Sequence, residues 1–416
     1  MFCRKPLITS VSLALLSLPF GASADGWLLQ PSITFDIGYD DNYDMDTTDP
    51  ESVGVAKVTG ELGVRRLSEA HYFKGGLLVD GVTYAGGDDV EANSNQVAYF
   101  NTTFRQPRSQ WGANFRYRRD SLLREAVSDD DTVVSQEEEL DATVDQLLDV
   151  TRQRVYFNPF ASYNLTRLTD IRADYQLSTV DHDLDDDEVY DVTDYTNQGA
   201  SLKLSHSLTT IDKVSVKVGG SLFATDVDED ETEYKTTYLR LGYDRSISPT
   251  FTVGGDLGYH VTDFDQGGED VEDDGLVGSL KAVKTTGLTR FELRAGLELY
   301  PSSIGQVVET RELVGNMTRS LSELLTFSLR SRFYENKGLS GSETVFGTNE
   351  SATAYNNRRS MTIRPELKWK ISREWTLGAA YRYQREKLDS KPDPAEGNAV
   401  LFSVRYTYLT ALSENQ

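Results

Sequence analysis

The chain has 416 residues and carries 66 acidic against 42 basic side chains, a formal net charge of −24. So acidic a protein repels phosphates, which excludes nucleic acid as a partner. No segment beyond the N-terminal region approaches 18 consecutive apolar residues, which excludes a helical membrane protein. This composition still allows a membrane barrel, because only alternate residues of a barrel strand face lipid.

The first segment, residues 1–24, has the pattern of a secretory signal peptide. Arg4–Lys5 supply the charged start, Leu7–Leu18 the short apolar stretch, and Ala22–Ala24 the small-residue cleavage site. Cleavage would remove Cys3, the one cysteine of the chain. We therefore expect a mature protein with neither a disulfide nor a thiol nucleophile.

The remaining chain, residues 25–416, shows strand-like alternation along its length and predicts about 18 strands, or 16. One face of the first strand is apolar and aromatic: Leu29, Pro31, Ile33, Phe35, Ile37 and Tyr39. The windows 276–287 and 306–320 alternate least regularly. The clearest alternation lies near the C-terminus, where Val400, Phe402, Val404 and Tyr406 interleave with Leu401, Ser403, Arg405 and Thr407.

Two kinds of connection alternate between these strands. Six short turns share an aliphatic residue, then Ser or Thr, then a polar residue or Pro: 67–69, 165–167, 208–210, 247–249, 321–323 and 371–373. The other connections are mostly acidic and are expected as loops at 40–52, 86–93, 124–149, 181–194, 226–233, 263–275, 301–305, 336–354 and 388–398. Short periplasmic turns and longer extracellular loops are typical of an outer-membrane barrel.

A soluble β-sandwich also has alternating strands, so it is the competing fold. The signal peptide and the separation of connections into a short set and a long acidic set favour the barrel. We therefore predict an all-β, transmembrane antiparallel up-and-down β-barrel in the outer membrane of a Gram-negative bacterium. A barrel of this size is wide enough to hold an aqueous channel.

The face opposite the apolar one should line the lumen, and it carries many charges. The cations that alternation directs inward are Arg116, Arg118, Arg172, Lys203, Lys217, Arg240, Arg290, Arg294, Arg330, Arg332, Arg364, Lys368, Arg382 and Arg405. The acids directed inward are Asp174, Asp244, Asp256, Glu292, Glu298 and Glu366. Our pore-lining candidates are Arg116, Arg118, Arg240, Arg294, Arg330, Arg332, Arg364, Arg382 and Arg405. Either these cations favour an anionic solute, or they pair across strands and keep a wet interior soluble.

Other chemistry has weaker sequence support. Asp226, Asp228 and Asp230 begin like a calcium loop, but Glu231 stands where that turn requires Gly. The four histidines, His71, His182, His206 and His260, are widely separated, and no G-x-S-x-G, H-E-x-x-H or P-loop pattern occurs. We therefore expect no enzyme, no catalytic residue, no cofactor and no metal site.

Inward-facing tyrosines offer one further hypothesis. Tyr238, Tyr300 and Tyr334 could stack on sugar rings along a carbohydrate path, since one face of a sugar is apolar. The alternative is that Tyr is simply a common strand residue.

The first strand running into Gly38-Tyr39-Asp40-Asp41-Asn42 resembles the β-barrel porin family of proteobacterial outer membranes, as do the stretch 117–123 and the Leu-Ser or Leu-Thr turns. Members of that family often accompany exopolysaccharide or capsule synthesis genes. The resemblance implies a porin-like barrel, with a role in passing polysaccharide across the outer membrane. It supplies no catalytic residues.

The first expectation is therefore the outer-membrane component of exopolysaccharide export. A general or anion-preferring diffusion porin is the alternative, and a plugged structural barrel without transport is a third. The expected partners are outer-membrane lipid and lipopolysaccharide, the barrel-assembly machinery, and periplasmic polysaccharide-export proteins with their polysaccharide.

Overall fold

The computed structural model describes residues 26–86, 93–121, 150–183, 193–227, 230–266, 269–301, 307–338, 357–389, 391–408 and 410–411. The strands are β1 (Trp27–Asp40), β2 (Val53–Leu67), β3 (His71–Ala85), β4 (Asn93–Arg105), β5 (Ser109–Ser121), β6 (Thr151–Asn164), β7 (Thr169–Asp183), β8 (Tyr195–Ser207), β9 (Asp212–Val227), β10 (Asp230–Ser248), β11 (Phe251–Gln266), β12 (Glu269–Thr286), β13 (Thr289–Pro301), β14 (Val307–Ser320), β15 (Leu325–Gly338), β16 (Arg358–Lys370), β17 (Trp375–Leu388), β18 (Ala395–Thr407) and β19 (Thr410–Ala411). No residue of these described ranges is helical. The described residues accordingly include no helix that is long and apolar enough to cross a membrane.

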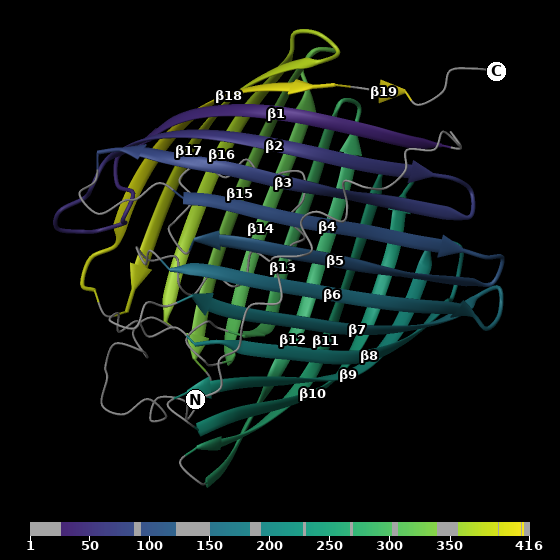
Figure 1. Ribbon diagram of the computed structural model, residues 1–416. Coiled ribbons are helices and arrows are strands. Elements are labelled where there is room, and N and C mark those ends of the chain that lie inside the picture. The colour runs from purple at the N-terminus through teal and green to yellow at the C-terminus, as the bar shows by residue number, and fades with distance from the viewer. Residues whose placement is uncertain are drawn as a thin grey trace, which may run out of the picture.

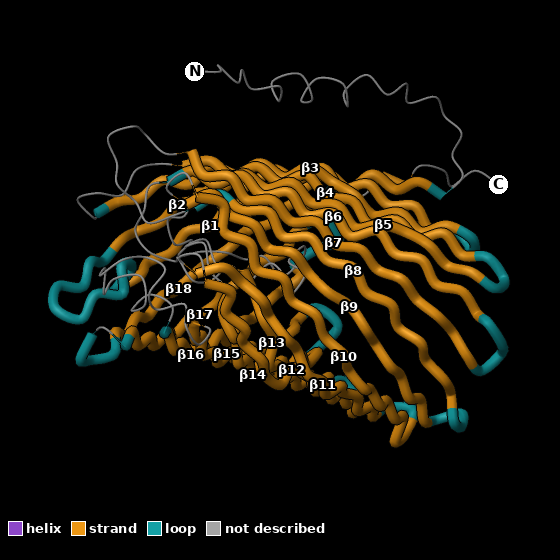
Figure 2. The backbone as a smooth tube through the Cα atoms, turned by 90° about the horizontal axis from the view of Figure 1, so that it is seen from below, coloured by secondary structure: helices purple, strands orange, loops and turns teal. Residues whose placement is uncertain are grey.

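Eighteen long strands form one closed antiparallel sheet, in which each pairs with its neighbours in sequence. The sheet closes where β1 pairs with β18, from Ser32 opposite Thr407 to Asp40 opposite Ala399. The two-residue β19 continues this seam by pairing with the start of β1. The first half of the strands forms one wall, and β11–β18 form the wall that crosses it (Figures 1 and 2). This confirms the predicted barrel and its count of 18 strands.

The two faces of each strand differ as the alternation predicts. Large apolar side chains are exposed on the outer face, such as Leu241 and Leu257, each 62% exposed and directly opposite one another. The neighbouring positions Arg240, Asp256 and Gly258 lie on the other face and line the interior. A closed sheet with an apolar exterior and a polar interior satisfies its backbone in lipid and its side chains in water. The protein is therefore a membrane-spanning β-barrel of the outer-membrane type.

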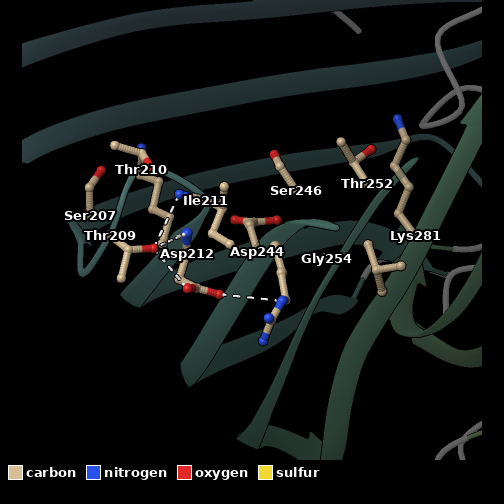
Figure 3. A pocket seen from close by; sticks show the side chains of 13 residues that line it. Ser207, Thr209, Thr210, Ile211, Asp212, Asp244, Ser246, Thr252, Gly254 and Lys281 are labelled. Atoms are coloured by element: carbon tan, nitrogen blue, oxygen red, sulfur yellow. Dashed lines mark hydrogen bonds and ion pairs between the residues drawn. The ribbon is translucent and has the colours of Figure 1, made fainter. Parts of the chain in front are cut away.

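The shared turn phrase has a physical cause. In all six turns the central Ser or Thr hydroxyl accepts hydrogen bonds from backbone N–H groups two or three residues later. Thr209 Oγ1 accepts from Ile211 N at 3.1 Å and from Asp212 N at 3.0 Å, and it donates to Asp212 Oδ2 at 2.8 Å (Figure 3). The corresponding acceptors in the other turns are Ser68, Thr166, Ser248, Ser322 and Ser372. These tight turns gather at one end of the barrel, the periplasmic end of an outer-membrane protein (Figure 2).

Two of the expected acidic loops are mostly strand. β9 and β10 stay paired up to Val227 opposite Asp230, within the predicted loop 226–233. β11 and β12 stay paired up to Gln266 opposite Glu269, within the predicted loop 263–275. Acidic residues are compatible with strands wherever a hairpin rises above the lipid into water, so composition overestimated these loops. The windows 276–287 and 306–320 are strands as predicted.

Some expectations fall outside the described residues. These are the signal peptide at 1–24, the loop at 124–149, and most of the loops at 86–93, 181–194, 301–305 and 336–354.

Thr209→Ala should lower the free energy of unfolding by about 0.5–1.5 kcal/mol, because two turn N–H groups lose their acceptor. The neighbouring Thr210→Ala is the matched control, since Thr210 accepts neither of these bonds, and it should change stability little. Urea titration of the refolded barrel, followed by tryptophan fluorescence, measures both. Equal losses in the two variants would contradict the capping role.

Candidate functional site: the inner wall

All nine pore-lining candidates lie on the inner face of their strands. In each strand they alternate with exposed apolar residues of the outer face, such as Trp111, Leu239 and Phe333. They are distributed over β5, β10, β13, β15, β16, β17 and β18. The structure does not gather them into one cluster. Whether they influence conduction remains a prediction.

Six of the nine arginines contact a carboxylate, four of them across strands as one alternative predicts, and Arg118 and Arg294 within their own strands. Arg118 contacts Asp120 at 3.0 Å, Arg332 contacts Glu312 at 2.7 Å, Arg382 contacts Asp40 at 2.5 Å and Arg405 contacts Glu61 at 2.7 Å, while Arg240 pairs with Glu298 and Arg294 with Glu292. For the other three candidates, the strand register gives the residues that they face. Arg330 lies directly opposite Arg364, and Arg116 lies between Tyr99 and Tyr156.

Arg240 makes the longest reach along the wall. Its guanidinium contacts Glu298 of β13 at 2.5 Å and Asp256 of β11 at 3.4 Å. Gly258 lies directly opposite Arg240, and a Cβ at Gly258 would collide with the Leu239 carbonyl and the Arg240 side chain. The glycine therefore leaves the space that the Arg240 side chain occupies.

The most unusual feature of the wall is a row of four cations, which we call the cation row. It consists of Arg172, Lys203, Lys217 and Arg240, and each member lies directly opposite the next on the adjacent strand from β7 to β10. The ends of the row are neutralised, since Arg172 contacts Asp174 at 2.7 Å and Arg240 contacts Glu298. Within the described ranges, no carboxylate lies within ion-pairing distance of the half-buried Lys203 or Lys217. Like charges directly opposite one another destabilise a sheet.

The segment between β1 and β2, residues 41–52, folds into the barrel, although its acidic composition predicts an outward loop. Tyr43 is fully buried against inner-face residues of four strands, namely Val53, Val55, Val82, Ala380 and Leu401. The backbone of Asn42 is also close to the inner wall, since its carbonyl would lie 3.1 Å from a Cβ at Gly397. The segment therefore occupies part of the lumen in its extracellular half.

Polar contacts fix this segment in place. Asn42 Nδ2 donates to the Glu396 carbonyl at 2.8 Å and to the Asp46 carbonyl at 2.9 Å. Asp46 in turn accepts from the Thr48 backbone N–H and from the Thr48 hydroxyl, each at 2.7 Å. These two bonds hold the pKa of the Asp46 carboxyl well below its ordinary value. Because the folded-state pKa is lowered, the stabilisation is present above the ordinary Asp range and is lost only as the pH falls through the lower value.

A second apolar cluster lies on the inner face near the extracellular ends of β7–β11. It contains a line of rings in which Tyr195, Phe223, Tyr234 and Phe264 follow one another at centroid distances of 5.2, 5.7 and 5.0 Å. These side chains are only 1–6% exposed. Neither apolar cluster was predicted from the sequence. The available signal was the presence of apolar residues near strand ends at positions that alternation directs toward the lumen.

The histidines and acidic positions do not assemble into a reactive group. His71 stacks on Phe104, His206 contacts Thr169, His182 contacts Asp194, and the buried His260 lies 3.4 Å from Thr262. Among the residues that the structure describes, no three His, Cys, Asp or Glu side chains are placed to hold a metal ion. The side chains at 226–232, where the calcium-like pattern begins, lie outside the described part.

Several solved structures are similar to this chain at low sequence identity. OccAB4 from Acinetobacter baumannii is 10% identical, with a TM-score of 0.47 over 94% of this chain and 100% of that one. OpdK from Pseudomonas aeruginosa, solved with vanillate, is 10% identical, with a TM-score of 0.46 over 92% and 99%. OccAB2 from Acinetobacter baumannii is 12% identical, with a TM-score of 0.45 over 94% and 99%. No protein-family model and no curated protein matches the chain.

Tyr43→Ala should raise single-channel conductance, because the segment 41–52 loses an aromatic anchor whose burial is worth about 3–5 kcal/mol. Tyr39→Ala removes a ring of the same size from the lipid-facing side of β1, where Tyr39 is 54% exposed. It should leave conductance unchanged. Planar-bilayer recordings compare the two variants, and equal conductance in both would contradict a constriction anchored by Tyr43.

Lys203→Gln should increase the free energy of unfolding by about 0.2–1 kcal/mol, because it removes a charge directly opposite a like charge. Lys213→Gln is the matched control on the same wall. Lys213 contacts Asp170 at 2.8 Å, so its neutralisation should give no gain. Urea titration of the folded barrels measures both, and a loss of stability in Lys203→Gln would contradict unrelieved repulsion.

Proposed function

We propose that this protein is a diffusion porin that favours small anionic solutes. The observation that carries the proposal is the cation row on the inner wall, and above all the two lysines at its centre. A porin needs a polar lumen, but it does not need like charges aligned across adjacent strands.

The electrostatic argument follows from the register. Lys203 and Lys217 repel one another, and a carboxylate, phosphate or chloride passing between them relieves that repulsion. Arg172 and Arg240 extend the positive potential to either side, although their carboxylate partners reduce it. Charge on a low-dielectric wall focuses the field into the lumen and raises the local concentration of the opposite ion.

Aromatic rings on the same wall do not favour a sugar path. The Tyr238 ring lies beneath Lys217 and Arg240, at 5.5 and 4.8 Å from its centroid, and the Tyr334 ring lies beneath Arg332 and Arg358. A cation over a ring face occupies the position in which a sugar would stack on that face. Exopolysaccharide export, the first expectation from the family resemblance, therefore has less support here than anion diffusion.

The double variant Lys203→Gln/Lys217→Gln should shift reversal potentials in a KCl gradient toward cation permeation. We expect the anion-to-cation permeability ratio to fall about threefold or more, since each charge contributes on the order of 1 kcal/mol at a few ångströms in water. Lys284→Gln/Arg319→Gln is the control, because these exposed cations lie on the outer face near the periplasmic end. It should leave the ratio unchanged.

Two outcomes would contradict the proposal. If the folded wild-type barrel forms no channels, the protein is not a diffusion porin. If it conducts but the lysine variant keeps the wild-type ion preference, the cation row does not set selectivity.

A further inference from the structure

A group of basic residues lies on the outer face of β14–β17, immediately above the apolar surface. We call it the arginine belt and define it as Arg311, Lys337, Arg359, Arg385 and Lys387. Alternation sets its position on the outer face. Arg311 lies on the same face as the lipid-facing Leu313 and one step nearer the extracellular end, and Arg385 lies beyond Tyr381 and Tyr383 in the same direction. The belt therefore stands at the height where the strands leave the hydrocarbon and enter the outer-leaflet headgroups.

The three arginines of the belt are exposed, its two lysines are half-buried, and the whole belt is only partly neutralised. The side chains of Arg311, Arg359 and Arg385 are 51%, 52% and 52% exposed. Glu335 lies directly opposite both Arg311 and Arg359 and contacts them at 3.7 and 2.8 Å. Each guanidinium has five N–H donors, which is more than these contacts use, so both retain donors for a further anion.

The lysines add to this surplus of positive charge. Lys387 lies directly opposite Arg359, and Lys337 lies opposite Glu309, which already contacts Arg311 at 2.9 Å. Arg385 has Glu396 at 3.6 Å. Five cations therefore stand among the three carboxylates Glu309, Glu335 and Glu396 on this part of the described surface.

The outer face of β11–β12 has the opposite charge at a comparable height. Asp263 and Glu272 lie directly opposite one another there, and Asp274 follows on the same face. All three are exposed. Lys235 of β10 is a further outward cation at this height, but it lies directly opposite Asp263 and contacts Glu233 at 2.9 Å, so the described surface there carries no excess of cations.

We propose that the arginine belt binds the phosphate groups of an outer-leaflet glycolipid, lipopolysaccharide being the partner expected from the location. Guanidinium groups suit this role because their planar forks donate two hydrogen bonds to one phosphate and are weakly hydrated. The acyl chains of the same lipid would lie along the apolar strand surface directly beneath the belt. A lipid is therefore a better match to this surface than a free anion, which would use only the charged part.

The test measures binding of lipid A to the purified, folded full-length barrel in detergent by native mass spectrometry. Bisphosphorylated lipid A should bind about tenfold or more tightly than the same lipid with both phosphates removed, since several basic residues near the membrane surface attract its phosphates together. Arg311→Gln/Arg359→Gln/Arg385→Gln should abolish that preference. The control Arg245→Gln/Lys284→Gln/Arg319→Gln removes three exposed outer-face cations at the periplasmic end and should keep it.

Three results would overturn the proposal. The two forms of lipid A could bind equally, the control triple variant could lose the preference as fully as the belt variant, or inorganic phosphate could displace the lipid completely. The last result would indicate a free-anion site. Heat-modifiable migration on gels verifies folding, and if the triple variant does not fold, the single Arg359→Gln should weaken binding of bisphosphorylated lipid A by about threefold.

Discussion

The structure depends on one constraint, which is that lipid offers no hydrogen-bond partner to a backbone N–H or C=O group. The pairing of β1 with β18 meets this constraint, because without it both strands would expose an unpaired edge to hydrocarbon. Closure also removes the usual globular core. Every strand then has one face toward lipid and one toward the lumen, so a two-residue period decides the environment of each side chain. Leu241 and Arg240 are adjacent in the chain, yet the exposed Leu241 faces lipid and the half-buried Arg240 faces the lumen.

This constraint explains where polar groups concentrate. The inner wall faces water, so it carries ion pairs. Arg382 contacts Asp40 and Arg405 contacts Glu61, and each pair joins strands on the two sides of the β1–β18 seam. The extracellular half of the lumen differs, because Tyr43 and the rings around Tyr234 bury apolar surface there. The extracellular half of the lumen therefore combines apolar packing with ion pairs, since Asp40, which contacts Arg382, lies directly opposite Val53 of the Tyr43 cluster. In the proposed porin, a solute entering from outside would pass the Tyr43 segment before it meets the lysines of the cation row.

The sequence predicts the strands well, because the period of two is imposed by lipid on one side and water on the other. It also predicts the turns, since the hydroxyl of Thr209 or Ser322 acts on backbone groups only two or three residues away. It fails where the partner is distant. Nothing local to Tyr43 indicates that the ring packs against Leu401, more than 300 residues along the chain. Alternation likewise places Lys203 and Lys217 on the inner face, but only the register between β8 and β9 makes them neighbours.

Acidic stretches were predicted as loops where the structure has strands, for a related reason. An acidic residue indicates contact with water, and both faces of a hairpin that rises above the lipid are in water. Asp263 and Glu272 can therefore occupy paired strand positions in a stretch that looks like a loop.

The magnitude of charge repulsion decides what the cation row implies about the lumen. Two unit charges about 4 Å apart repel by about 1 kcal/mol in water, but by about 4 kcal/mol at the effective dielectric near a protein surface. A barrel whose stability is limited tolerates the first cost more easily than the second, particularly because flexible lysine stems can separate their charged ends. The row is therefore compatible with a hydrated lumen at this height and difficult to reconcile with a dry, plugged one. In a hydrated lumen, an anion between Lys203 and Lys217 is attracted to both charges at once. Their mutual repulsion therefore favours binding of an anion between them.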